Sequence, residues 1–312
     1  MKKITLLLTL TFSILLGFGQ YGGGSPETIE LWKNKTLIVM QYPGYEIYNA
    51  AVKTVVNERW YNNKIEFLDY TSNRNYKVLK KRKDAIILCV DDLFDVGAPV
   101  ICFAQPTHSF FYNKTGWAYV NIQSDHEIEY KKWKSDLKKN NPNSIPSTDA
   151  YGLEILNRST LERTILLIEL LFNTTDQFKS GEFRYKSAKK DNGFYNTSGN
   201  INKIKNKTLL IERKSISRKN DNKKLLQITH LQSIYKGEIK IVTEKELQET
   251  IIIRDKNLLY LQVEEVAHLP TYAIVDIAER KVVYCNQQSP PTITNNIKRF
   301  ERMLENLSNS IF

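Results

Sequence analysis

NKTLIV at residues 34–39 returns 172 positions later as NKTLLI at residues 206–211. Each copy is a polar turn followed by a short apolar run, which is typical of a buried strand. Four further pairs of segments share an apolar pattern and follow in the same order: 61–68 with 235–242, 84–90 with 257–263, 118–122 with 273–277, and 161–171 with 297–307. Because five matches in one order rarely arise by chance, we predict an internal duplication.

Each copy alternates strands with helices. In the first copy, Tyr48–Trp60 places apolar residues on one helical face, between strands at 35–40 and 64–69. In the second copy, Thr243 and Glu246 have the spacing of a capping box at the start of a helix. This alternation predicts the α/β class: two tandem, duplicated small α/β sandwich units with mainly parallel sheets flanked by helices, and with the late strands adding antiparallel at an edge.

The two copies differ in length. The offset between matched segments falls from 173 at the third strand to 155 at the fourth and to 136 at the last helix, so the first copy carries two insertions. In the first insertion, within residues 91–117, turn residues bound two short apolar runs and favour a hairpin. We predict a first repeat with two insertions over residues 27–175, a basic linker over 176–202 and a second repeat over 203–312. A short ordered piece around Phe183–Tyr185 is an alternative within the linker.

Residues 1–19 have the features of a secretory signal peptide. Two lysines precede an apolar run over residues 4–16, and the small residues Gly17 and Gly19 stand where a signal peptidase cleaves. An N-terminal membrane anchor is the alternative, but the apolar run is short for a bilayer span. We predict an exported protein, periplasmic or secreted, that begins at Gln20 and has no transmembrane segment in its mature chain.

Three cysteines are too few and too scattered for a disulfide framework. Export makes oxidation possible. Cys89 and Cys102 are close enough in sequence to face each other across neighbouring strands, so they are the preferred pair, and Cys285 is left as a thiol. The alternative, three buried cysteines that act as small apolar residues, stays open.

Acidic pairs follow the third strand of both copies: Asp91-Asp92 and Glu264-Glu265. The carboxyl ends of parallel strands are where α/β sheets bind ligands, and paired carboxylates can perform acid–base chemistry. Asp91, Asp92 and His108 are therefore the candidate catalytic residues of a hydrolase, although acids that merely solvate a strand end are an alternative.

The sequence has no phosphate-binding glycine motif and no zinc-ligand spacing, so we expect neither a cofactor nor a metal.

Aromatic residues gather in the first insertion. Rings that face outward there can stack on a sugar or pack against a protein partner, whereas rings that face inward fill the core of the sheet. Both alternatives remain open from the sequence. The candidate binding residues are Phe103, Phe110, Phe111, Tyr112 and Trp117.

Basic residues concentrate in one segment of a chain whose formal net charge is +11. Residues 179–224 carry fourteen Lys or Arg and four acids, a charge that can attract an acidic polymer or an anionic surface. A solvated linker is the alternative. An exported protein rarely meets nucleic acid, so we expect no nucleic-acid partner. The candidate anion-binding residues are Lys189, Lys190, Arg213, Lys214, Arg218 and Lys219.

The second copy, in the stretches KNKTLLI and IYKGEIKIVTEKELQETIIIRDKNLLYLQV, resembles repeats of uncharacterised exported bacterial proteins. The resemblance covers most of residues 30–311 and implies no catalytic residues. The strand–helix order is also similar to small envelope domains such as the N-terminal domain of the Tol-system propeller protein, a likeness of topology that does not fix function. We expect an exported, non-enzymatic binding or scaffold protein of the cell envelope, whose partner is an envelope protein or an acidic polymer. The alternative is a hydrolase that acts on an envelope or extracellular polymer.

Overall fold

The computed structural model comprises two compact units, which are described one at a time. The N-terminal unit spans Gly22–Gly181, and the C-terminal unit contains Glu182–Phe312. Within the part of the chain that the structure describes, no helix is both long and apolar enough to cross a bilayer. The described residues are 21–22, 30–70, 79, 81–92, 99–104, 118–122, 133, 135–136, 139, 150–187, 194–198, 201–216, 228–266, 269–287 and 296–312.

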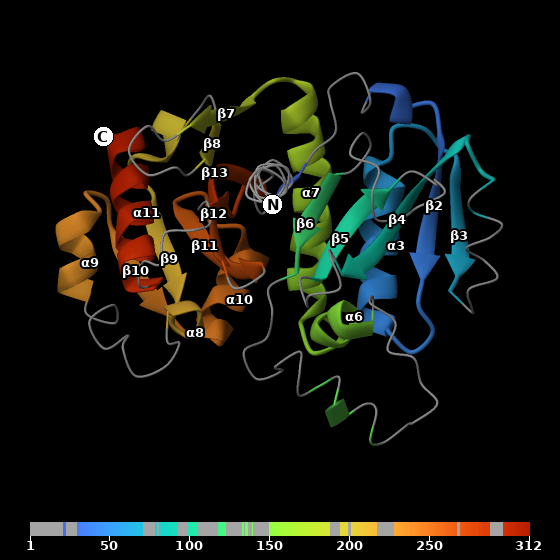
Figure 1. The fold of residues 1–312 in the computed structure, drawn as a ribbon, viewed down its shortest axis with the longest axis horizontal. Helices are drawn as coiled ribbons and strands as arrows, with labels where there is room; N and C mark the ends of the chain where they lie inside the picture. The colour runs from blue at the N-terminus through green and yellow to red at the C-terminus, as the bar shows by residue number, and fades with distance from the viewer. Residues whose placement is uncertain are drawn as a thin grey trace, which may run out of the picture. The chain divides into compact units, whose positions relative to one another are not determined.

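A six-stranded mixed sheet forms the centre of the N-terminal unit (Figure 1). Strand β2 pairs in parallel with β3 and with β4, whereas β4–β5 and β5–β6 are antiparallel. The apolar run of NKTLIV is the interior strand β2, where Leu37, Ile38 and Val39 are buried as predicted. In sheet order the strands are β1 (Tyr21–Gly22), β6 (Ala118–Asn121), β5 (Pro99–Ala104), β4 (Ala85–Asp92), β2 (Thr36–Gln41) and β3 (Ile65–Asp69).

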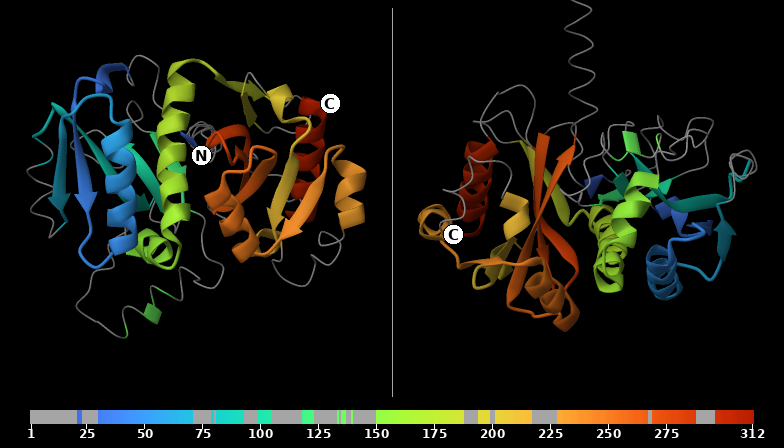
Figure 2. Two further views of the ribbon diagram at one scale, coloured as in Figure 1. Left: turned by 180° about the vertical axis from the view of Figure 1, so that it is seen from behind. Right: turned by 90° about the horizontal axis from the view of Figure 1, so that it is seen from below.

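Helices α3 (Glu46–Arg59), α6 (Ala150–Asn157) and α7 (Leu161–Lys179) pack on this sheet. Helices α3 and α7 contact each other, and α7 also contacts β5 and β6 (Figure 2). The predicted apolar stripe of α3 is confirmed, because its buried residues recur at helical spacing: Tyr48, Ala51, Val52, Val55 and Val56.

A seven-stranded mixed sheet forms the C-terminal unit. Two of its strands lie in the predicted basic linker, which is therefore partly ordered sheet: β8 pairs with β13, and β7 pairs with β8. The many charges of this segment suggested a linker, although Phe183 and Tyr185 alternate with basic residues in a strand pattern. In sheet order the strands are β10 (Ile239–Val242), β9 (Thr208–Glu212), β11 (Leu258–Val266), β12 (Leu269–Asp276), β13 (Lys281–Gln287), β8 (Phe194–Ser198) and β7 (Phe183–Ser187).

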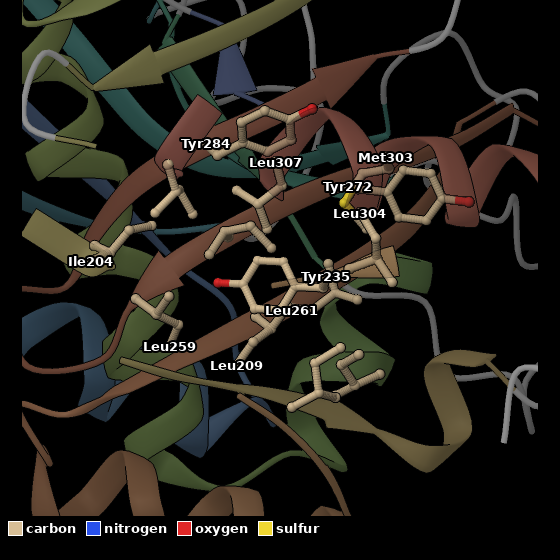
Figure 3. Close-up of a cluster of buried hydrophobic side chains, with 14 of the residues drawn as sticks. Ile204, Leu209, Tyr235, Leu259, Leu261, Tyr272, Tyr284, Met303, Leu304 and Leu307 are labelled. Atoms are coloured by element: carbon tan, nitrogen blue, oxygen red, sulfur yellow. The ribbon is translucent and has the colours of Figure 1, made fainter. Parts of the chain in front are cut away.

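Helices cover the C-terminal sheet and close its core. The predicted capping box of α10 is confirmed: the Thr243 amide donates to Glu246 Oε2 at 2.7 Å, and the Glu246 amide donates to Thr243 Oγ1 at 3.3 Å. Tyr235, Leu261 and Leu304 belong to a buried apolar cluster formed by strands and helices (Figure 3). The helical segments are η2 (Ile201–Ile204), α8 (Arg213–Ile216), α9 (Ile228–Ile234), α10 (Glu244–Ile253) and α11 (Asn296–Ile311).

The two sheets share one strand order. The series β3-β2-β4-β5-β6 and β10-β9-β11-β12-β13 each run through two parallel pairs and then two antiparallel pairs. The sheets are therefore mixed rather than mainly parallel, because the antiparallel strands form a larger part of each sheet than predicted. In this strand order β6 corresponds to β13, so the topology does not support the predicted match of 118–122 with 273–277. The first unit has extra length between β5 and β6, at 105–117 against 277–280, and more of it between β6 and α7, at 122–160 against 288–295 before α11.

Candidate functional site

The acidic pair Asp91-Asp92 lies inside a strand, not in the loop after it. Strand β4 continues through both residues, which face Val100 and Pro99 across the antiparallel β4–β5 ladder. Asp91 is buried. The prediction that placed this pair just after the strand is therefore wrong about its position, because both residues belong to β4.

The equivalent acids of the C-terminal unit are placed in the same way. Glu264 and Glu265 lie within β11 and face Thr271 and Pro270 of β12. Both acidic pairs follow apolar runs, and for this reason the sequence predicted that they lie just after the strands. The antiparallel pairing of β4 with β5 and of β11 with β12 instead continues through the acidic residues. His108, the third catalytic candidate, lies outside the described residues. Among the residues that the structure does describe, no three His, Cys, Asp or Glu side chains gather in a metal-binding group.

Phe103 belongs to the core of the N-terminal unit and is only 1% exposed. Its ring lies 5.1 Å from that of Phe172, 5.8 Å from that of Trp60 and 6.0 Å from that of Trp32, measured between ring centroids. A ring enclosed in this way cannot stack on a ligand, so the prediction of Phe103 as a binding residue is wrong. The other aromatic candidates, Phe110, Phe111, Tyr112 and Trp117, lie outside the described residues.

Two of the six candidate anion-binding residues lie in a described element. Arg213 and Lys214 are the first residues of the short helix α8, and Arg213 is exposed. The structure brings no further basic candidate to them within the described part of the chain. Lys189, Lys190, Arg218 and Lys219 lie outside it.

Among the described side chains of the N-terminal sheet, those of β3 are the most exposed. Strand β3 lies at one end of the described strand order, where it pairs with β2 (Figure 1). None of its five residues is buried, although Ile65, Phe67 and Leu68 are apolar. The Phe67 side chain is 39% exposed. An edge strand with accessible apolar residues is a template on which another strand can pair.

The hydrogen-bond register identifies which backbone groups of β3 face outward. The Leu37 amide donates to the Lys64 carbonyl at 2.8 Å, and the Tyr70 amide donates to the Gln41 carbonyl at 2.7 Å. Even-numbered residues of β3 therefore direct their backbone groups toward β2. Because these groups alternate along a strand, Ile65 and Phe67 direct their N–H and C=O groups to the outer edge.

Charged side chains border both faces of β3. On one face, the Lys53 ammonium of α3 lies 5.8 Å from the centroid of the Phe67 ring. On the other, Arg82 donates to the two Glu66 carboxylate oxygens at 3.0 and 3.1 Å. Arg82 also donates to Asp84 at 2.9 Å. The bonds to Asp84 and Glu66 raise the pKa of Arg82, and the bond from Arg82 lowers the pKa of Glu66. Strand β3 therefore presents the apolar Phe67 ring beside a lysine on one face and the Glu66–Arg82 ion pair on the other.

The corresponding edge strand of the C-terminal unit is better covered. Strand β10 also ends its sheet, yet Ile239 and Val242 are buried there. The sequence predicted both strands but did not single out β3, because exposure depends on which helices cover each edge. The only feature of the sequence that indicated an exposed strand at β3 was the presence of Glu66 and Asp69 among its three apolar residues.

Searches for relatives found no family model, no curated protein and no solved structure that matches this chain.

Proposed function

We propose that the protein is an exported, non-enzymatic binding or scaffold protein of the cell envelope, periplasmic or secreted. Its N-terminal unit binds an extended segment of an envelope protein along the outer edge of β3. The observation that carries the proposal is the exposure of β3, a strand with no buried residue whose register directs the backbone groups of Ile65 and Phe67 outward. The signal-peptide features of residues 1–19 support export.

Strand addition is the binding mode that fits this edge. An extended segment beside β3 gains main-chain hydrogen bonds, and pockets for alternate side chains give it specificity. Phe67 offers an apolar contact on one face, next to the Lys53 ammonium. Glu66 and Arg82 offer charges on the other face. A partner segment with alternating apolar and charged residues is complementary to both faces.

Under the same proposal, the two units are copies of one ancestral α/β unit, as the resemblance to repeats of exported bacterial proteins also suggests. Their common strand order supports this origin. Matched backbone hydrogen bonds at the start of β2 and β9 support it further, because corresponding residues of the two units make the same bonds. The pairs, donor first, are Lys35–Trp32 at 2.9 Å with Lys207–Ile204 at 3.0 Å, Thr36–Asp84 at 3.0 Å with Thr208–Asn257 at 2.9 Å, and Leu37–Lys64 at 2.8 Å with Leu209–Glu238 at 2.8 Å.

Export is tested by the mass and location of the mature chain. Fractionation of producing cells, followed by intact-mass measurement, is expected to find a chain that begins at Gln20 outside the cytoplasm. A full-length chain retained in the cytoplasm would contradict the proposal.

Binding at β3 is tested with a pair of substitutions at one residue. Phe67→Pro removes the outward N–H, which an edge strand tolerates, whereas Phe67→Ala keeps the N–H and removes only the ring. Affinity capture from envelope extract is expected to recover a partner with wild type, less of it with Phe67→Ala and none with Phe67→Pro. The same partner should then bind through a synthetic peptide of its extended segment. Equal recovery by Phe67→Pro would exclude the edge as the contact.

A further inference from the structure

Cys89 and Cys102 face each other in the core of the N-terminal unit. They are direct partners in the antiparallel ladder between β4 and β5, both interior strands of the sheet. Their Sγ atoms lie 3.7 Å apart. Both residues are buried, with 4% and 2% of their surfaces exposed. The two sulfurs are therefore neighbours within one packed region, and both are thiols in this structure.

The two sulfurs need to move only a short distance to form a disulfide. A disulfide needs its sulfurs about 2.05 Å apart and its Cβ atoms about 3.5–4.5 Å apart. Residues directly opposite in an antiparallel pair have Cβ atoms about 4.5–5.5 Å apart. Rotation about the Cα–Cβ bonds brings the two sulfurs together, and a slight approach of the strands brings the Cβ atoms into range.

We propose that Cys89 and Cys102 are a disulfide-forming pair that links β4 to β5 in the mature protein, oxidised by exchange with a disulfide of the exported compartment. The inference rests on export, one part of the proposed function, and not on binding at β3. Export would deliver the chain to a compartment where disulfides persist.

The exchange balances in two steps. One cysteine thiolate attacks a sulfur of the oxidant disulfide, so that a mixed disulfide forms and one oxidant thiol leaves. The second thiolate attacks the protein sulfur of the mixed disulfide, so that the Cys89–Cys102 bond forms and the second oxidant thiol leaves. The protein loses two protons and two electrons, and the oxidant disulfide takes up both as two thiols.

The third cysteine supplies an internal control. Cys285 lies in β13 of the C-terminal unit, where its cross-strand neighbours are Ala273 and Asn196. Neither neighbour can form a disulfide. The C-terminal unit has Gln262 and Ala273 at the ladder position that Cys89 and Cys102 occupy in the N-terminal unit. The cysteine pair is therefore specific to one unit.

Thiol counting tests the pair. The mature chain is refolded in oxidised and reduced glutathione, denatured, alkylated with N-ethylmaleimide and weighed intact. One added maleimide is expected, at Cys285, against three after full reduction. Peptide mapping is expected to join Cys89 to Cys102, and the oxidised protein should keep its native circular dichroism and unfold several degrees higher, because the bond constrains the unfolded chain.

Matched variants make the outcome decisive. Cys285→Ser is expected to take no maleimide after oxidation and two after reduction, whereas Cys102→Ser should form no internal disulfide. Three maleimides on the refolded wild type would overturn the proposal. A bond to Cys285, or a Cys89–Cys102 bond found only in chains without native circular dichroism, would also overturn it. None of these readouts involves the β3 edge, so failure here is distinct from failure of the binding proposal.

Discussion

Two phenylalanines on strands of the same unit should respond very differently to truncation. Phe103 is 1% exposed and contacts three aromatic rings, whereas Phe67 is 39% exposed and contacts the Lys53 ammonium. Removing a buried Phe side chain costs roughly 3–5 kcal/mol, from lost burial and the cavity left behind. We therefore expect Phe103→Ala to lower the free energy of unfolding by about 4 kcal/mol. Phe67→Ala should lower it by about 1 kcal/mol, since much of its ring is already in water.

Tryptophan fluorescence can follow this unit alone, because all four tryptophans of the chain lie between residues 32 and 133. Urea denaturation monitored by this signal gives the free energy of unfolding for each variant. The part of the circular dichroism signal that does not follow tryptophan fluorescence reports the C-terminal unit and serves as the internal control. Equal losses for the two variants, or a Phe103→Ala loss below about 1.5 kcal/mol, would refute the assignment of Phe103 to the core and of Phe67 to an open edge.

Three other perturbations follow from local contacts. Gly152→Ala is expected to destabilise the N-terminal unit by about 1–3 kcal/mol in urea denaturation, because the added Cβ would lie 2.8 Å from the side chains of Val90 and Pro99. Unchanged stability would show that α6 packs less closely on β4 and β5. Tyr61→Phe removes a 2.7 Å hydrogen bond from Tyr61 Oη to Asp176 and should cost about 1 kcal/mol, with Asp176→Asn as the matched partner variant. Bonds from Thr243 lower the pKa of Glu246, so its stabilising effect holds above its unfolded pKa and is lost as the pH falls through its folded pKa. Glu246→Gln should remove this acid-dependent part of the thermal unfolding profile, and an unaltered profile would contradict it.

Short-range features of the fold could be read from the sequence. The runs in NKTLIV and NKTLLI are interior strands, the stripe beginning at Tyr48 is the buried face of α3, and Thr243 caps α10. Each depends on residues close together in the chain, where periodicity and capping chemistry act directly. The strand alternation also indicated the α/β class.

Long-range features could not be read in the same way. The position of Asp91 inside a ladder depends on how far β5 extends, and the enclosure of Phe103 depends on Phe172, which lies 69 positions later. The strand at 194–198 pairs with β13, a partner that lies far away in sequence, and the strand at 183–187 pairs in turn with 194–198. The exposure of β3 likewise reflects which elements cover the sheet, a property that no local pattern encodes.

Residue-resolved amide hydrogen exchange along β3 tests the binding edge most directly. In the isolated protein, the Phe67 amide is expected to exchange rapidly and the Leu68 amide slowly, because only the second faces β2. When the captured partner is added, Phe67 should become protected while Leu68 remains unchanged. Slow exchange at Phe67 in the isolated protein, or no added protection with the partner bound, would contradict an open edge that receives an extended segment.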